Sequence, residues 1–272
     1  MTAALRTAPL SARIGMAVVL LYLLAALFAP WLAPFGETEI VGAQYLPWDA
    51  KHPLGTDGIG RDMLSRLIFG ARNTLAIAVA ATVLAFVVGA GLGMLAALRQ
   101  GLVDQLLSRA VDVLIAIPSL IFKMMLLTIF GTSVATLVAI IALIDATRIF
   151  RVARAISMNI AVNEYVEAAY LRGDGILRLV GREILPNAAA PLVAEFGLRF
   201  CFVFLSISAL SFLGIGLQPP MADWGSMVRE NASLVTFGDI TPLLPAFAIA
   251  FLTIGTNLVV DWMLHRSSGL KD

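Results

Sequence analysis

The chain has 272 residues, of which 60% are hydrophobic and 14% are charged, and its mean hydropathy is +0.91. Soluble domains are about 45 to 50% apolar, so this composition predicts a protein of the lipid bilayer. The net charge of +1 offers neither a basic excess that would favour nucleic acid nor an acidic tail. The single cysteine, Cys201, excludes an internal disulfide and a multi-cysteine metal site.

Apolar runs long enough to cross the hydrocarbon core need about 20 helical residues at about 1.5 Å each. We predict six such spans, at residues 14–33, 74–98, 111–130, 134–150, 188–214 and 242–260. The first run follows Arg6 and Arg13, as a secretory signal would. It exceeds the apolar length of such signals, about 7 to 15 residues, so we interpret it as a retained anchor. The predicted fold class is an all-α membrane protein with six transmembrane helices.

The positions of Lys and Arg predict how these spans are oriented. Twelve of them fall on the side that contains both termini and five on the other side, with Lys123 and Arg199 inside spans. The positive-inside rule therefore places both termini in the cytoplasm. The predicted segments are a cytoplasmic N-terminus (1–13), an anchor helix (14–33), an external segment with a surface helix (34–73), a five-helix core (74–264) and a cytoplasmic tail (265–272).

The external segment between the first two spans contains its own helical pattern. Apolar residues recur at helical spacing after Asp62, at Met63, Leu64, Leu67 and Ile68. This pattern predicts a short helix that lies on the outer surface. His52, beside Pro53 in the same segment, is expected at the protein surface.

The cytoplasmic segment 151–187 lies between the fourth and fifth predicted spans. Its sequence predicts a helix from Glu164, a break at Gly173 and a second helix that ends at Pro186. Such a helix-turn-helix would project from the membrane. Two small and two apolar residues on the first helix would suit a groove on a partner protein: Ala168, Ala169, Tyr165 and Leu171. An ordinary arginine-rich loop is the alternative that composition leaves open.

The spacing within this segment resembles the EAA motif of permeases in the ATP-binding-cassette importer superfamily. The matching positions are Glu167, Ala168, Ala169, Gly173, Leu185 and Pro186, preceded by Glu164 and Tyr165. Glu183 departs from the motif, which commonly has an apolar residue two positions before Leu185. The resemblance implies that these residues form a loop that couples the membrane helices to an ATPase.

Further strings resemble the second permease of oligopeptide, dipeptide and nickel importers, over most of residues 14–264. They lie at residues 54–57, 60–62, 112–118, 185–187, 211–214, 218–220 and 224–225. The resemblance implies a homologous second permease, two cytoplasmic ATPase subunits that bind ATP and magnesium, and an external solute-binding protein. It also implies alternating access in a bacterial cytoplasmic membrane. The candidate contacts for the binding protein are Asp57, Arg61, Asp62 and Trp224.

Residue types needed for catalysis are scarce in this chain. No lysine stands in a Gly-Lys-Ser/Thr string, so the sequence contains no P-loop for ATP. Two histidines, His52 and His265, leave little for a histidine metal site or a Ser-His-Asp triad. We predict no catalytic residue, metal site or cofactor in this chain. The rival functions are a secondary transporter or channel that does not use ATP, and a membrane-embedded enzyme.

Ionisable residues inside the spans cost about 2.5 to 3.5 kcal/mol each and usually face a cavity or a partner. The candidates for the translocation pathway are Lys123, Asp145, Glu195 and Arg199. Glu195 and Arg199 stand four apart with the acid first, which predicts an ion pair that lines the solute pathway or packs against the second permease. Lys123 and Asp145 differ in depth by about 9 Å at about 1.5 Å per residue. Their pairing requires the lysine to extend along its helix.

Small residues and prolines within the spans suggest how the helices pack. The glycines 89, 91 and 93 include a small-xxx-small pair, for which close helix packing is favoured over a gating hinge. Pro118, Pro191 and Pro245 are positions where helices can kink. For the cargo, short peptides are favoured, with nickel chelates, opines, glutathione and glycosides as alternatives. The absence of histidine from the spans argues against a bare metal ion.

Overall fold

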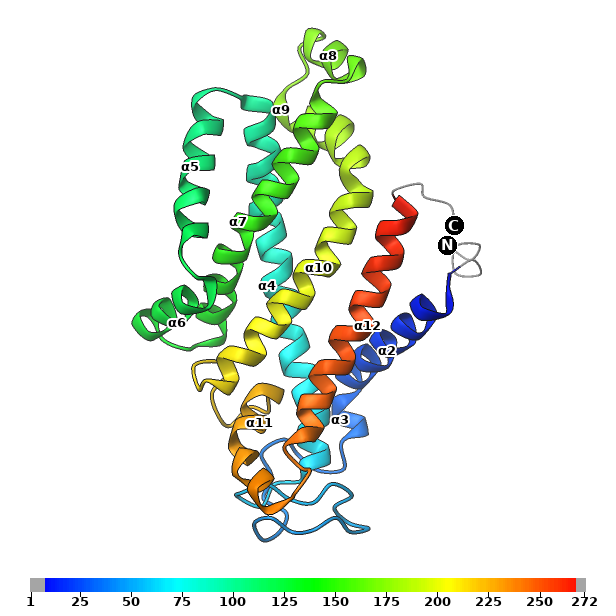
Figure 1. The fold of residues 1–272 in the computed structure, drawn as a ribbon, viewed down its shortest axis with the longest axis vertical. Coiled ribbons are helices and arrows are strands. Elements are labelled where there is room, and N and C mark those ends of the chain that lie inside the picture. Colours follow the sequence, from blue (N-terminus) through cyan, green and yellow to red (C-terminus); the bar gives the residue numbers. More distant parts are fainter. Residues whose placement is uncertain (1–7, 268–272) are drawn as a thin grey trace.

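A computed structural model describes residues 8–267, which form a bundle of helices without a β-strand (Figure 1). Arg6 and Lys271, which entered the charge count, lie outside the described residues. The helices are α2 (Leu10–Leu27), α3 (Ala29–Leu32), α4 (Met63–Arg99), α5 (Leu102–Ala116), α6 (Ser119–Phe130), α7 (Val134–Ala161), α8 (Glu164–Leu171), α9 (Ile176–Leu179), the π-helix η1 (Val180–Ile184), α10 (Leu185–Phe212), α11 (Trp224–Asn231), the 3-10 helix η2 (Ala232–Phe237) and α12 (Leu243–Ser267).

Helices α4 and α7 pack along each other at the centre of the bundle (Figure 1). Two glycines of α4 allow this approach. A Cβ added at Gly89 would lie 2.5 Å from the carbonyl oxygen of Ala146, and one at Gly93 would lie 2.6 Å from that of Phe150. A Cβ at Gly91 would meet no atom within 4 Å. Close packing by the Gly89 and Gly93 pair is therefore confirmed.

The N-terminal helix α2 packs against α12 through another pair of glycines. A Cβ at Gly15 would lie 2.5 Å from the carbonyl oxygen of Gly255, and one at Gly255 would lie 2.8 Å from the Val18 side chain. Tyr22 of α2 meets the ring of Trp224 edge-on, with 5.5 Å between ring centroids. These contacts fix α2 against the rest of the bundle.

The predicted surface helix of the external segment is wrong as a separate element. The helix that begins at Met63 continues without a break to Arg99, so it includes the second predicted span. Asp62 caps its first turn, because its carboxylate accepts a 2.8 Å hydrogen bond from the Ser65 amide. Between Met63 and Thr74 the sequence has no proline, and its one glycine, Gly70, stays helical.

The third predicted span, residues 111–130, is a bent pair of helices and not one rod. Helices α5 and α6 meet at an angle of 91°. Pro118 has no amide hydrogen to donate, and Ile117 before it is extended, with a ψ of 131°. The expectation that a helix can kink at Pro118 is confirmed, although the apolar run was predicted as a single span.

The second cytoplasmic helix does not end at Pro186, contrary to the prediction. Residues 176–212 form one continuous helical segment through α9, η1 and α10. The π-helical turn lies just before Pro186, which occupies the first turn of α10. The widened turn accommodates the missing amide hydrogen, and the Asn187 side chain donates a 2.6 Å hydrogen bond to the Glu183 carbonyl.

Four helical segments are long and apolar enough to cross a membrane: α2, α4, residues 176–212 and residues 243–265 of α12. The bent pair α5 and α6 would make a fifth. Helix α7 is the remaining predicted span, and it contains four charged residues: Asp145, Arg148, Arg151 and Arg154. The architecture is thus an all-helical bundle with several apolar spans.

Candidate functional site

The segment 164–186, called the knob from here on, projects from one end of the bundle, opposite α11 and the loop 33–62 (Figure 1). We call this loop the external loop after its predicted position. Helix α8 begins at Glu164, and Gly173 ends it with a φ of +82°, as the sequence predicts. The amide of Asp174 donates to the Ala169 carbonyl and thus closes the last turn of α8. Asp174 then accepts a 2.7 Å hydrogen bond from Arg178, which lowers the pKa of its carboxyl group.

Two buried side chains attach the knob to the bundle. Val166 and Ile184 belong to a hydrophobic cluster formed with α4, α7 and α10. Burial of such a side chain stabilises a fold by about 1.5 to 3 kcal/mol. The motif commonly has an apolar residue at position 183, where this chain has Glu183. Glu183 is partly exposed, and the neighbouring Ile184 is fully buried and makes the apolar contact of this turn.

The outer surface of the knob is exposed and partly apolar. Glu164, Tyr165, Glu167 and Ala168 are exposed, and so are Leu171 and Leu177, at 77% and 89%. Ala169 is fully buried, so its small size serves packing within this chain. Every predicted motif position except Ala169 is exposed, including Gly173, Leu185 and Pro186, and the motif did not single out the exposed Tyr170 and Leu177. Their exposure to solvent is a property of the folded knob that the spacing does not encode.

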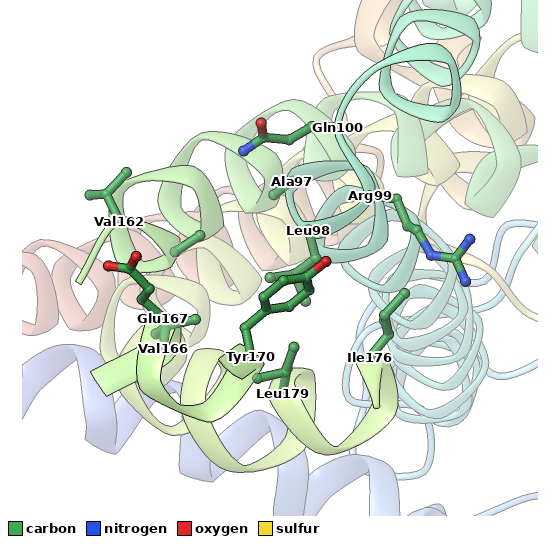
Figure 2. Close-up of a pocket in the computed structure, with 11 residues that line it drawn as sticks. Ala97, Leu98, Arg99, Gln100, Val162, Val166, Glu167, Tyr170, Ile176 and Leu179 are labelled. Carbon is green, nitrogen blue, oxygen red and sulfur yellow. The ribbon is translucent and has the colours of Figure 1, made fainter. Parts of the chain in front are cut away.

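A cavity of about 650 Å³ separates the knob from the ends of α4 and α7 (Figure 2). Tyr170 and Glu167 of α8 line one wall, and Arg99 with Gln100 at the end of α4 line another. Val166 and Leu179 of the knob also line it, and Ala97 and Leu98 line it from α4. The knob is thus held along one edge and leaves space beneath its first helix.

At the opposite end, buried ionic contacts hold the external loop to α4 and α11. We call this network the outer framework, and its members are Asp57, Arg61, Arg66 and Glu230. Arg66 donates to Asp57 at 2.5 Å and to Glu230 at 2.9 Å, and Arg61 donates to Asp57 at 2.7 Å. Burial acts to raise the pKa of Asp57, but the amides of Arg61 and Ile59 and the two guanidinium groups outweigh it and lower this pKa.

The predicted docking residues of the external face are all buried. Asp57, Arg61, Asp62 and Trp224 are each at most 6% exposed. Trp224 donates its indole N–H to the Leu67 carbonyl at 2.9 Å. A docking protein would therefore meet the loop that these side chains hold, and not the side chains themselves.

His52 is buried, so the prediction of a surface histidine is wrong. Its Nδ1 lies 3.1 Å from a carboxylate oxygen of Asp62, and its ring stacks on Phe35 with 5.3 Å between centroids. The surrounding loop folds back over this residue, an arrangement that the local sequence pattern does not indicate. Among the residues that the structure describes, no group of three or more His, Cys, Asp or Glu side chains is placed to hold a metal ion.

The predicted ion pair of α10 is confirmed. Arg199 Nε lies 2.6 Å from Glu195 Oε1, and both side chains are about nine-tenths buried, with 12% and 11% of their surface exposed. The Arg199 guanidinium also lies over the Phe202 ring, 5.2 Å from its centroid. The two charges therefore neutralise each other along one face of the helix.

Lys123 and Asp145 also form an ion pair, although the sequence predicts different membrane depths for them. Lys123 Nζ donates to Asp145 Oδ2 at 2.7 Å and to Ser206 Oγ at 2.9 Å, and both charged side chains are buried. The bend before α6 brings Lys123 beside α7, so extension of the lysine along its helix is not what closes the gap.

Two further ion pairs, which sequence reasoning did not find, join α5 to α7. Arg151 lies 2.5 Å from Asp112, and Arg154 donates two hydrogen bonds to Asp104. The partners are 39 and 50 residues apart in the chain, so no local spacing indicates them.

Comparison with known proteins places these features in a family. The family described as "Binding-protein-dependent transport system inner membrane component" matches residues 89–268. A second family, described as "N-terminal TM domain of oligopeptide transport permease C", matches residues 11–53. The first match includes the whole knob, and the second includes all of α2 except Leu10.

Curated relatives match nearly the whole chain. The "Di/tripeptide transport system permease protein" of Pseudomonas aeruginosa is 35% identical over 95% of this chain and 85% of its own length. The "Dipeptide transport system permease protein" of Haemophilus influenzae is 32% identical, over 96% and 88%. The "Glutathione transport system permease protein" of Pectobacterium atrosepticum is 30% identical, over 93% and 83%. This chain therefore belongs to the family of inner-membrane components of binding-protein-dependent transport systems.

Proposed function

We propose that this chain is the permease subunit of an ATP-driven, binding-protein-dependent importer for di- or oligopeptides. Membership of the permease family is the observation that supports this function, and several of the similar relatives are named for peptide transport. One relative is named for glutathione transport, so glutathione, itself a small peptide, is a second candidate cargo.

The proposed topology has six spans with both termini in the cytoplasm. The bent pair α5 and α6 and the charged helix α7 would supply the two spans beyond the four apolar segments. The knob would then face the cytoplasm, and the outer framework would face the binding protein. Placement of these two regions at opposite ends of the bundle supports this orientation (Figure 1).

ATP hydrolysis would take place in two separate ATPase subunits, each of which binds ATP and magnesium. The knob would dock into a groove of one ATPase through the exposed Tyr165, Ala168 and Leu171. Closure of the ATPases on ATP would move the knob, and the helices joined to it would open the solute pathway toward the outside. Hydrolysis of ATP would reverse this motion and open the pathway toward the cytoplasm. A homologous second permease would form the other wall of the pathway.

The Glu195 and Arg199 pair would line this pathway. Its two opposite charges lie at membrane depth, where ionisable groups usually serve a cavity or a partner. A peptide with free ends carries one positive and one negative charge, which this pair would meet. Replacement of both residues by Gln would then lower peptide uptake, whereas unchanged uptake of all tested peptides would assign the pair to packing.

Reconstitution in proteoliposomes tests the whole proposal. The complex of this chain with its second permease, two ATPases and a binding protein should accumulate labelled dipeptides only with ATP. Glutathione and a nickel chelate, measured in parallel, decide the cargo class. Solute movement by this chain alone, without ATP, would instead support a secondary transporter or channel.

Disulfide crosslinking tests the coupling role of the knob. In a Cys201→Ala background, Ala168→Cys should crosslink to a cysteine in the ATPase groove, because Ala168 is exposed on α8. Thr38→Cys, exposed in the external loop, is the matched control and should give no crosslink. Absence of a crosslink from Ala168→Cys in every nucleotide state would contradict this role.

A further inference from the structure

Helix α6 is a short segment isolated between two breaks in the chain. The extended Ile117 and Pro118 precede it, and Gly131, with a φ of +86°, follows it. It stands at 91° to α5, although residues 111–130 are apolar enough for one straight span. Pro118 interrupts the helix here, and the contacts of α6 with the bundle determine where α6 then lies.

Two buried side chains, Lys123 and Leu127, attach α6 to the bundle. They are four residues apart and so lie on the same face of the helix. Leu127 packs in the hydrophobic core, a contact that has no directional preference. Lys123 donates directed hydrogen bonds to Asp145 of α7 and Ser206 of α10. Phe122, Met124 and Leu126 also pack against this core, but the lysine makes the directed polar contacts that join α6 to both helices.

The bent arrangement also explains why this charge pair is tolerated at membrane depth. In a straight span, Lys123 would swing away with the second half of the segment and leave Asp145 without its cation. An unpaired buried charge is strongly disfavoured. The pair therefore favours the bend over the straight form.

The helices that Lys123 joins are the two that lead to the knob. Helix α7 ends at Ala161, three residues before α8 begins. Helix α10 follows directly on α9 and η1, which are parts of the knob. Figure 1 shows α7 and α10 running from the knob end of the bundle toward α6. Any displacement of the knob thus reaches both partners of Lys123.

We propose that Lys123 is a positioning residue, which holds α6 against α7 and α10 so that α6 follows the movement of the knob. This role rests on the transport function proposed above. Helix α6 presents apolar side chains away from the bundle, with Ile121 and Ile129 at 63% and 67% exposed. The ion pair decides where that apolar surface lies in each step of the transport cycle.

Distance measurements in the complete reconstituted complex test the proposal directly. Spin labels at Ile129→Cys of α6 and Val193→Cys of α10, both exposed, would be used in a Cys201→Ala background. With Lys123 present, we expect one narrow distance distribution in each nucleotide state. In Lys123→Met, we expect a broad distribution and at least a tenfold loss of maximal peptide uptake, with an unchanged half-saturating concentration of binding protein.

Two double variants separate positioning from stability. Lys123→Glu with Asp145→Lys restores opposite charges and should recover the narrow distribution and at least half of the uptake. Lys123→Met with Asp145→Leu removes both charges and should fold, because apolar replacement of a buried pair is often well tolerated. We expect this apolar double variant to show the same broad distance distribution and low uptake as Lys123→Met. The double variant therefore tests the positioning role even if Lys123→Met alone does not fold.

Wild-type uptake and a narrow distribution in the apolar pair would overturn the proposal, and so would failure of the exchanged pair to restore either readout. Failure of the wild-type complex to accumulate peptide with ATP would instead contradict the proposed function. The distance distributions would still report in that case whether Lys123 holds the bend.

Discussion

The knob and the outer framework are both marked by short sequence motifs, yet they differ in where their motif residues lie. Glu164, Tyr165, Glu167 and Ala168 of the knob are exposed, whereas all four motif residues singled out on the external face are buried. A motif can thus denote a surface for a partner or an internal support for a loop. The distinction predicts different consequences of mutation, because internal supports affect folding and exposed positions affect association.

The largest effect on stability is expected for Arg66→Met in the outer framework. Arg66 is 1% exposed and pairs with Asp57 and Glu230. Among the described residues, its loss leaves Arg61 as the one guanidinium partner of the buried Asp57 carboxylate. Removal of one partner from a buried ionic contact costs up to about 3 to 5 kcal/mol. Thermal unfolding of the purified protein measures this change. The control is Arg72→Met, exposed on the same helix, which should stay within about 0.5 kcal/mol. Equal losses of stability in the two variants would contradict the distinction between buried supporting residues and exposed residues.

Acid should weaken the outer framework. The folded pKa of Asp57 is lowered, so its contribution to stability is complete above the unfolded value of about 3.9 and is lost as the pH falls through the folded value. Melting temperatures measured from pH 7 down to pH 3 should therefore decline at the acid end. Asp57→Asn should show a shallower decline, and parallel profiles would argue against a role for this carboxylate.

A smaller effect is expected for Gly173→Ala in the knob. The left-handed backbone at Gly173 costs another residue about 1 to 2 kcal/mol. A Cβ there would meet no atom within 4 Å, so the whole effect comes from the backbone. Hydrogen exchange should become faster in α8, with little change elsewhere. Gly181→Ala, at a helical glycine with equally open surroundings, is the control and should not accelerate exchange.

The smallest change in stability is expected for Leu171→Asn at the exposed end of α8. Exposed substitutions stay within about 0.5 kcal/mol, so the melting temperature should be nearly unchanged. Binding of the ATPase subunits, measured by pull-down titration, should weaken at least tenfold, because Leu171 is 77% exposed and apolar. The matched control is Ile40→Asn, at a residue that is 67% exposed in the external loop. Comparable weakening of ATPase binding by this change would contradict a contact between Leu171 and the ATPase.

Local sequence patterns predicted the parts of this fold that depend on neighbouring residues. The start of α8, the break at Gly173 and the pairing of Glu195 with Arg199 all follow from spacings of a few residues. The close contact of Gly89 with α7 was anticipated in the same way. Helical periodicity and glycine conformation determine these features.

The features that sequence did not predict depend on contacts between distant segments. Lys123 meets Asp145 across the bend at Pro118, a proline that the sequence marked as a possible kink without indicating a bend of 91°. His52 is buried because the loop returns over Asp62. Helix length was underestimated at α7, which ends at Ala161, and at the continuous segment 176–212, because both extend beyond the apolar runs into more polar sequence.

The continuous segment 176–212 connects the knob to the opposite end of the molecule without an intervening loop. At about 1.5 Å per residue it is about 55 Å long, so a tilt of about 10° would displace one end by about 10 Å relative to the other. Its far end is held by α11, since a Cβ at Gly225 would lie 2.2 Å from the Ser208 carbonyl oxygen. A tilt of this segment at the knob would therefore also displace α11 at the opposite end of the bundle.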